Sequence, residues 1–495
     1  CAKTGTPTGG YKDTIPPVML NSSPKNKTTS FSSEKITITF DEYISLNNIN
    51  EQLIISPPIE SDKYTIEPQS AISKKIKIEF TDSLSLADNT TYTFNFGSSI
   101  EDNNESNVLP FFSYTLSTGK IIDSLFLKGK ISDAFEQESE KFISLYLYPI
   151  DSLHNDSTIY LKKPLYATST LDSIVYNFQN LRDDYYQFIA IKDYGKNYLY
   201  DQGIDKIGFI NKSIKLPGDT IYNFRIFKEE SAFFWDRPKY KNDHHIIFGY
   251  YGIPEKNPIK LITPVPKGFK TLITKEREKD SLNFWFPEIE ADSLLFALKT
   301  KDSTYNVSVK FYKPELDSLV ISSKQSRVLD LNDTLQFTSS LPITELNEEF
   351  ISIRNKDSIQ IPFKLILDKN KDLIKIPFDL EPNDKYSVSI LPDSFKDMWG
   401  GTNDSINLNL ITKAFDSYGV INLRLNWEIS EQDFILELLD VTNNVLRRVY
   451  EKNEFNTYTF KFLNPQNYIA RIILDNNQNK KWDTGNYLKK IQPER

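Results

Sequence analysis

Cysteine is almost missing from this chain of 495 residues, which has a single Cys at position 1. One Cys cannot form an internal disulfide, and a Cys-rich zinc site is excluded with it. Histidine is nearly as scarce, with His154, His244 and His245 as the whole supply. The composition therefore gives no support to a Cys–His nucleophile pair.

Long apolar runs and basic runs are missing as well. No stretch approaches the roughly 20 apolar residues that a membrane-spanning helix needs. The net charge is -8, and charges of both signs are mixed locally, as in KEREKD (275–280). Because phosphate binding needs clustered positive charge, we expect no nucleic-acid partner.

The chain is rich in Phe and Tyr, with 33 and 27 residues against two Met. These residues favour strands over helices. Apolar and polar residues alternate in KITITF (35–40), KKIKIEF (74–80) and NTTYTFNFG (89–97), and Asn, Asp, Ser or Pro bound each segment. Alternation with a period of two is typical of half-buried strands. The sequence therefore predicts an all-β, multidomain chain of β-sandwiches.

An internal repeat supports this organisation. Segment 176–203 recurs without a gap as segment 458–485, at a constant offset of 282 residues. The alignment pairs Tyr176 with Tyr458, Phe178 with Phe460, Leu181 with Leu463, Tyr186 with Tyr468, Asp193 with Asp475, Asn197 with Asn479, Asp201 with Asp483 and Gly203 with Gly485. A weaker repeat precedes each copy and pairs Tyr92 with Tyr386 and Asp102 with Asp397.

The repeats predict tandem Ig-like β-sandwiches that alternate with small β-sandwiches of the carboxypeptidase-regulatory or transthyretin-like type. The expected ranges are a tether over 1–17, an Ig-like sandwich over 18–118, a small β domain over 119–230, an unassigned middle β domain over 231–316, a second Ig-like sandwich over 317–416 and a second small β domain over 417–495.

The position of Cys1 needs an explanation, because the chain starts there rather than at Met. Either this end is arbitrary, or a secretory signal was removed ahead of Cys1. We expect the second, with Cys1 lipidated as in bacterial lipoproteins. Acyl chains stabilise membrane attachment by about 0.8 kcal/mol per buried methylene group. The Gly, Thr and Pro residues up to Pro17 then form a flexible tether.

The segments CAKTGTPTGGYKDTIPP, ITITFDEYISL, NTTYTFNFG, EDNNESN and FFSYTLSTG together resemble the SbsA-type bacterial Ig-like domain of Bacteroidota outer-membrane lipoproteins. The ending RIILDNNQNKKWDTGNYLKKIQPE is similar to the usual C-terminus of these proteins. The resemblance implies a lipid-anchored outer-membrane protein at the cell surface, and it implies no shared activity. Surface-exported members often have acidic residues after the Cys, whereas Ala2, Lys3 and Thr4 follow here. A location on the periplasmic face of the outer membrane therefore stays an alternative to the cell surface.

Two loops share the form D-x-[NG]-x-N-x-x-x-D-x-G, which suits a calcium ion that takes oxygen ligands from alternate positions of a tight loop. The candidate ligands are Asp193, Asn197 and Asp201 in the first loop, and Asp475, Asn477, Asn479 and Asp483 in the second. The bidentate Glu of an EF-hand is absent. Asx turns closed by glycine would give the same composition, and we expect this alternative more than calcium.

One triplet is unusually frequent: Asp, then Ser or Thr, then an aliphatic residue or Thr. Ordinary residue frequencies would give only about two or three such triplets. The pattern resembles the O-glycosylation acceptor of exported Bacteroidota proteins, although Asp-Ser is also a natural entry from a turn into a strand. The candidate acceptors are Thr14, Ser83, Ser124, Ser152, Ser157, Ser173, Thr220, Ser281, Ser293, Ser303, Ser318, Thr334, Ser358 and Ser405.

The remaining candidates are three tryptophans beside Pro, Gly or charged residues, namely Trp235, Trp285 and Trp399. Such rings are concentrated in protein interfaces, but they also fill sandwich cores. No phosphate loop or nucleophile motif occurs, and His244 and His245 would face opposite sides of a strand.

We therefore expect a non-enzymatic scaffold or interaction subunit of an outer-membrane β-barrel complex for protein assembly, secretion or uptake. It would need no cofactor beyond possible calcium. A carbohydrate-binding surface lipoprotein is the alternative, and a calcium-dependent adhesin is a remote one.

Overall fold

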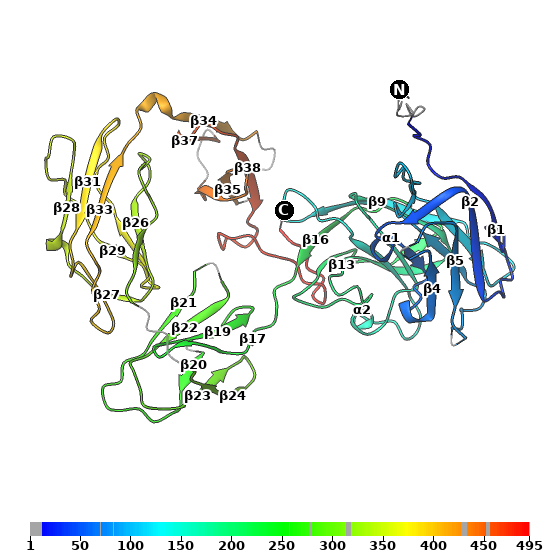
Figure 1. Ribbon diagram of the computed structural model, residues 1–495, viewed down its shortest axis with the longest axis horizontal. Helices are drawn as coiled ribbons and strands as arrows, with labels where there is room; N and C mark the ends of the chain where they lie inside the picture. Colours follow the sequence, from blue (N-terminus) through cyan, green and yellow to red (C-terminus); the bar gives the residue numbers. More distant parts are fainter. Residues whose placement is uncertain are drawn as a thin grey trace, which may run out of the picture. The chain divides into compact units, whose positions relative to one another are not determined.

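The computed structural model describes residues 12–69, 71–82, 84–256, 258–277, 279–312, 318–426, 433–451 and 456–494. The chain forms two compact units (Figure 1). Unit 1 combines the chain up to Glu230 with the segment from Trp482, and unit 2 runs from Ser231 to Lys481. Strands dominate both units, which confirms the all-β prediction. None of the described helices is long and apolar enough to cross a membrane.

The first part of unit 1 is an Ig-like β-sandwich. A sheet of order β1-β2-β5-β4, with β7 on β2, shares its core with a sheet of order β3-β6-β8. Alternation places Ile36 and Ile38 of β2 inside, against Phe94 of β6 and Tyr114 of β8. The elements are β1 Met19–Ser23, β2 Lys35–Leu46, α1 Ile49–Gln52, β3 Ile54–Ser56, β4 Tyr64–Glu67, β5 Ser73–Phe80, β6 Thr91–Asn95, β7 Ile100–Asp102 and β8 Ser113–Ser117.

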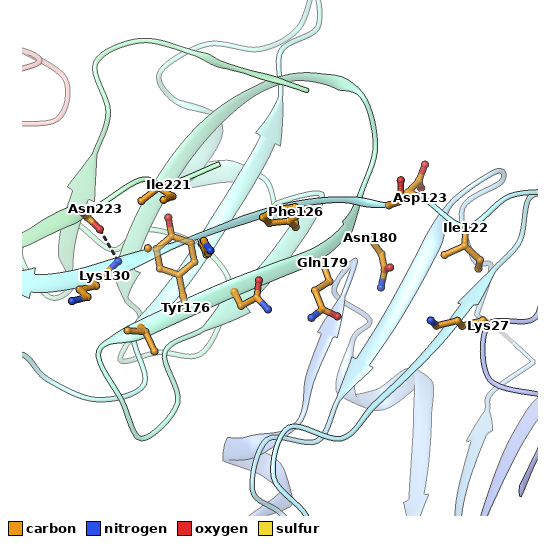
Figure 2. A pocket seen from close by; sticks show the side chains of 15 residues that line it. Lys27, Ile122, Asp123, Phe126, Lys130, Tyr176, Gln179, Asn180, Ile221 and Asn223 are labelled. Atoms are coloured by element: carbon orange, nitrogen blue, oxygen red, sulfur yellow. Dashed lines mark hydrogen bonds between the residues drawn. The ribbon is translucent and has the colours of Figure 1, made fainter. Parts of the chain in front are cut away.

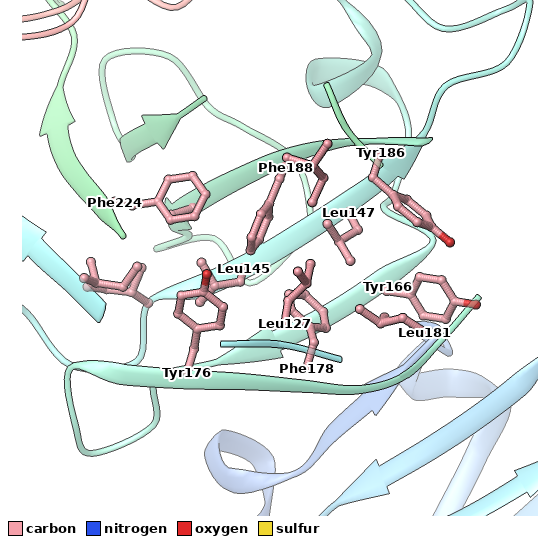
Figure 3. Close-up of a cluster of buried hydrophobic side chains, with 14 of the residues drawn as sticks. Leu127, Leu145, Leu147, Tyr166, Tyr176, Phe178, Leu181, Tyr186, Phe188 and Phe224 are labelled. Atoms are coloured by element: carbon pink, nitrogen blue, oxygen red, sulfur yellow. The ribbon is translucent and has the colours of Figure 1, made fainter. Parts of the chain in front are cut away.

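The second part of unit 1 is a strongly curved sheet of order β11-β10-β13-β14-β16-β9-β12, with β15 on β13. Its concave side encloses the cluster of Figure 3, in which Phe188 packs edge-to-face against Tyr176, Phe178 and Phe224. The elements are β9 Leu125–Asp133, β10 Ser144–Pro149, α2 Thr158–Leu161, β11 Tyr166–Ser169, β12 Val175–Leu181, β13 Asp184–Lys192, β14 Lys206–Phe209, β15 Ile214–Leu216 and β16 Phe224–Lys228.

The outer side of this sheet carries a second apolar cluster, which includes Tyr146, Ile189 and Ile207. The C-terminal segment 482–494 contributes to its cover, and Tyr487 is 1% exposed. The sequence predicts this segment as the end of the last small domain, whereas the structure groups it with unit 1. The domain ranges otherwise stay predictions.

Unit 2 begins with the middle β domain, which has its own core around Phe248, Phe284 and Phe296. A sheet of order β17-β19-β22-β21, with β18 on β19, shares this core with a sheet of order β20-β23-β24. The elements are β17 Phe234–Trp235, β18 Lys239–Asn242, β19 His245–Tyr251, β20 Ile259–Leu261, β21 Leu272–Lys275, β22 Ser281–Trp285, β23 Ser293–Lys299 and β24 Thr304–Lys310.

A second Ig-like sandwich and a second small sheet domain complete unit 2, each with its own core. The Ig-like elements are β25 Ile321–Ser323, β26 Leu335–Ser339, β27 Ile343–Leu346, β28 Ile351–Arg354, β29 Ile366–Leu367, β30 Leu373–Ile376, β31 Lys385–Ile390, β32 Phe395–Asp397 and β33 Ile406–Ile411. The small domain has β34 Gly419–Arg424, β35 Phe434–Leu439, β36 Val445–Val449, β37 Thr457–Leu463 and β38 Ile469–Leu474.

The structure reproduces the predicted repeat between the small domains. β12 and β37 begin and end 282 residues apart and have the same burial pattern. Asn180 and Phe462, again 282 apart, both have left-handed backbones, with φ of 58° and 57°. The Tyr186 hydroxyl donates to the Arg182 carbonyl at 2.9 Å, and the Tyr468 hydroxyl donates to the Asn464 carbonyl at 2.5 Å.

The Ig-like copies share a polar clamp as well. The hydroxyl oxygen of Tyr92 accepts the Ala87 N–H at 2.9 Å, and that of Tyr386 accepts the Glu381 N–H at 2.7 Å. In both copies the Tyr hydroxyl accepts the N–H of the residue five positions earlier in the chain, so the backbone enters the strand in the same way. The repeated sequence signal therefore reflects repeated backbone geometry.

Candidate functional site

A groove of about 1150 Å³ opens on unit 1, over the convex side of strands β9 and β12 (Figure 2). Phe126, Lys128 and Lys130 of β9 line it, beside a row from β12. That row consists of Val175, Asn177 and Gln179. The groove continues to Ile221 and Asn223 at one end, and to Ile122, Asp123, Asn180 and Lys27 at the other.

Strand alternation decides which side chains reach the groove. In β9, Leu127 and Ile131 point into the core, so Phe126, Lys128 and Lys130, which alternate with them, point outward. The register places Val175 opposite Lys130 and Asn177 opposite Lys128. The floor of the groove is therefore a two-stranded surface with alternating apolar, amide and ammonium groups.

Three residues hold this surface in place. A Cβ on Gly129 would lie 1.7 Å from the Tyr222 carbonyl oxygen, so only glycine lets the 222 segment pack so closely on β9. The Tyr176 hydroxyl donates to the same carbonyl at 2.7 Å, and burial raises the pKa of Tyr176. Asn180 donates to the Thr93 hydroxyl at 2.8 Å and so ties the end of β12 to the Ig-like sandwich.

The rim of the groove is positively charged. Lys27, Lys128 and Lys130 are all exposed. The lining acid, Asp123, is engaged, because its carboxylate accepts the Thr91 hydroxyl at 2.8 Å. The groove thus offers apolar contact together with unneutralised ammonium groups.

The tryptophans predicted from sequence do not form an exposed surface. Trp235 and Trp285 are 8% and 6% exposed. The Trp235 indole N–H donates to the Lys299 carbonyl at 3.0 Å, and that of Trp285 donates to the Thr274 hydroxyl at 2.9 Å. Both rings are buried and both indole N–H groups have hydrogen-bond acceptors inside the fold. The hypothesis that Trp235 and Trp285 form an interface is therefore wrong, and both belong to the core.

Trp399 is half-buried in unit 2, where its ring lies 4.7 Å from that of His244. His245 stacks on Trp285 at 3.8 Å. The His244 Nδ1 lies 3.1 Å from the Phe286 carbonyl oxygen, and the His245 Nε2 lies 2.9 Å from the Asn283 side-chain oxygen. The adjacent histidines therefore have structural partners.

The first Asp/Asn loop is organised by carboxylates that cap the backbone. Asp193 accepts the N–H of Asn197 at 3.3 Å, the N–H of Tyr198 at 2.9 Å and the Tyr146 hydroxyl at 2.9 Å. Asn197 donates to Asp201 at 3.0 Å. Burial raises the pKa of Asp205, which accepts the Asp201 N–H at 2.9 Å.

The second loop repeats this capping. Asp475 accepts the N–H of Asn479 at 3.0 Å and that of Lys480 at 2.8 Å. Asn477 also accepts the Asn479 N–H, at 3.1 Å, and the Asp483 N–H donates to Glu494 at 3.0 Å within unit 1. Over the described ranges, no group of three or more His, Cys, Asp or Glu residues is arranged to hold a metal ion. The contacts favour the Asx-turn alternative.

We expect excess EDTA to leave the melting temperature of the chain unchanged, because Asp193 and Asp475 are already engaged by backbone N–H groups. Differential scanning calorimetry with and without added calcium checks this. A rise of several degrees in calcium, lost on adding EDTA, would instead establish a cation in these loops.

The candidate glycosylation sites differ in access. The exposed ones are Thr14, Ser124, Ser152, Ser157, Ser173, Ser303, Ser318, Ser358 and Ser405, and the half-buried ones are Thr220, Ser293 and Thr334. Ser281 is buried and donates to Glu276 at 2.6 Å, which removes it as an acceptor in the folded chain. Cys1 and Ser83 lie outside the described residues.

Many of the Asp-Ser/Thr triplets mark the starts of strands. The strands β9, β22, β23, β24, β26 and β33 each begin at the second or third residue of such a triplet. The turn-to-strand alternative therefore accounts for these triplets. Modification of the exposed hydroxyls stays a prediction.

The groove itself was not predicted from sequence, although β9 carries a signal for it. In LFLKGKI (125–131), the alternation that buries Leu127 and Ile131 leaves Phe126 on the solvent side, where a polar residue is usual. The contribution of Lys27 and the 219–223 loop needed the tertiary fold, because both are distant in sequence from β9.

A family model matches the first part of the chain. Residues 13–118 match the family model of the bacterial Ig-like domain. The chain is similar to the pullulanase SAP of Group B Streptococcus at 14% identity, covering 32% of this chain and 22% of that chain with a TM-score of 0.13. Less than a quarter of the pullulanase is thus spanned. No curated protein sequence matches the chain.

Similarity to other solved structures is equally low. A multidomain segment of titin shares 13% identity over 50% of this chain and 94% of that chain, with a TM-score of 0.15. SGBP-B of the Bacteroides ovatus mixed-linkage glucan utilization locus, in complex with a heptasaccharide, shares 8% identity over 71% of this chain and 92% of that chain, with a TM-score of 0.18. The family match thus extends over residues 13–118, which are similar to the bacterial Ig-like domain.

Proposed function

We propose that the protein is a non-enzymatic interaction subunit of an outer-membrane β-barrel complex, anchored by lipid on Cys1 and docked on a partner protein through the groove of unit 1. The observation that carries the proposal is the apolar lining of that groove. Phe126, Val175 and Ile221 are 46%, 50% and 61% exposed. Exposed apolar side chains gathered in one groove, with polar groups around them, mark interaction sites.

A lipid anchor would strengthen such docking without adding contacts. Confinement to the membrane surface raises the effective concentration of the groove beside membrane-embedded partners. A single groove of modest affinity is then sufficient for stable association.

We expect Phe126→Asp to abolish co-purification of the partner from gently solubilised membranes, because the charge replaces the central apolar contact of the groove. Folding is expected to be retained, since the Phe126 side chain is half exposed. Quantitative mass spectrometry after affinity purification provides the measurement.

The repeat supplies a matched control. Register places Val420 of β34 where β9 has Phe126, and Val420 is 57% exposed. Val420→Asp should leave co-purification unchanged. Recovery of the wild-type chain as a solitary monomer, or capture by a glycan array that Phe126→Asp abolishes, would contradict the protein-docking role.

A further inference from the structure

The groove has a regular pattern that restricts what can occupy it. Phe126, Lys128 and Lys130 are successive outward residues of β9. Outward residues of one strand follow each other at roughly 6.6 Å. An extended peptide presents alternate side chains at the same spacing. The groove floor therefore matches an extended chain better than a compact ligand.

The size of the groove favours a chain segment as well. Pockets for small molecules have volumes of about 300–1000 Å³, and this groove has about 1150 Å³. Sugar chains stack on exposed aromatic faces, but Tyr176 is 3% exposed, which leaves Phe126 as the accessible ring in the lining. A polypeptide with an apolar side chain needs only this one ring.

The charge of the groove indicates the charge of the ligand that it can bind. No hydrogen bond or ion pair joins the side chain of Lys27, Lys128 or Lys130 to another residue of the described ranges. The Asp123 carboxylate, which is the acidic group of the lining, is bonded to Thr91. Three ammonium groups beside one engaged acid attract carboxylates and repel basic segments.

We infer that the groove of unit 1 binds an extended acidic segment of the partner protein, with side chains in the order apolar-x-acidic-x-acidic. The apolar side chain packs on Phe126. The two carboxylates pair with Lys128 and Lys130, and Asn177 and Gln179 hydrogen-bond the peptide backbone. The inference rests on the proposed function and names the chemistry that the partner presents.

Fluorescence anisotropy of a labelled synthetic peptide tests the inference with the full chain. The peptide carries Leu, Glu and Glu at alternate positions in a Ser–Thr background. We expect saturable binding that weakens steeply as salt rises, because exposed ion pairs are screened. Phe126→Asp should abolish binding, and the double variant Lys128→Glu, Lys130→Glu should weaken it at least about tenfold.

The second small domain again provides a control, since Asn422 and Arg424 occupy the positions of Lys128 and Lys130. The double variant Asn422→Glu, Arg424→Glu should bind the peptide like the wild type. Equal binding of a peptide with Gln in place of Glu would overturn the inference. So would a failure to bind the acidic peptide while vesicles containing anionic lipid or an acidic oligosaccharide are bound.

The two proposals fail in different ways. If Phe126→Asp abolishes co-purification but the acidic peptide does not bind, the docking role stands and the acidic-segment inference is wrong. If no partner co-purifies with the wild-type chain, the docking role is wrong, whatever the peptide does.

Discussion

Tyr487→Ala is expected to destabilise unit 1 by about 3–5 kcal/mol, the usual cost of removing a buried aromatic side chain. Tyr487 is 1% exposed, and its ring lies 5.4 Å from that of Phe209 and 6.3 Å from that of Tyr160. Its backbone N–H donates to the buried carboxylate of Glu229, which also accepts the Tyr200 hydroxyl at 2.8 Å. Loss of the ring would loosen the whole C-terminal segment.

Other contacts of the segment depend on the same anchor. Trp482 packs on Phe135 with ring centroids 4.8 Å apart, and Thr484 donates to the Lys228 carbonyl at 2.6 Å. Lys490 pairs with Asp156 at 2.6 Å, although exposed pairs of this kind contribute little alone. Because these groups are held in place by the buried ring, their contributions would be lost together.

Thermal unfolding measures the effect, and the transition of unit 1 should fall on the order of 10 °C. Hydrogen exchange of β13 and β14, which lie under Tyr487, assigns the loss to unit 1. Leu488→Ala is the control, since Leu488 is 50% exposed and should change stability by less than about 0.5 kcal/mol. Tyr487→Phe should cost only about 1 kcal/mol. Equal effects of the Tyr487→Ala and Leu488→Ala changes would show that the segment does not anchor unit 1.

The C-terminal segment also shows where sequence reasoning stops. The repeat predicted that β12 and β37 are equivalent. The cover over the outer side of β13 could not be predicted, because it depends on a segment far along the chain. A sequence signal did exist: Ile189 of β13 stands where β38 has Arg471. A strand that is apolar on both faces needs cover on both.

The aromatic residues predicted to be functional are not the ones that line the groove, because tertiary structure decides which aromatic rings are exposed. Local sequence placed Trp285 beside Pro and charge, yet strand pairing carries it into a core where Thr274 accepts its N–H. Conversely, Phe126 was not singled out, since an apolar residue in a strand is usually taken as core. Alternation fixes which residues share a face, but it cannot say which face a neighbouring element covers.

The outer face of the second small domain is stabilised by ion pairs rather than by an apolar cover. Removing the central carboxylate should cause the second large loss of stability. Glu437 of β35 is 2% exposed and lies between two arginines across the sheet. Its carboxylate accepts from Arg448 Nε at 2.6 Å and from Arg471 Nε at 2.8 Å and Nη2 at 2.6 Å. These contacts raise the pKa of Arg448, mainly through its hydrogen bond to Glu437.

We expect Glu437→Ala to destabilise unit 2 by about 3 kcal/mol, because it leaves two cations beside each other with Arg471 only 19% exposed. Arg448→Ala should cost less than about 1 kcal/mol, since that side chain is 51% exposed and its ion pair is screened by solvent. Urea unfolding followed by hydrogen exchange in β35 measures both.

The double variant Glu437→Leu, Arg471→Leu separates charge from packing. Replacing Glu437 and Arg471 together removes the more buried of the two cations, so the double variant should be more stable than Glu437→Leu alone, which keeps Arg471 and removes the carboxylate that it pairs with. Simple additivity of the two single losses would mean that Glu437 acts by filling space. Strong non-additivity would mean that the ion pair holds β35, β36 and β38 in register. In the first small domain, Tyr146 and Ile189 hold the same positions without charge, because the C-terminal segment contributes to the cover of that face.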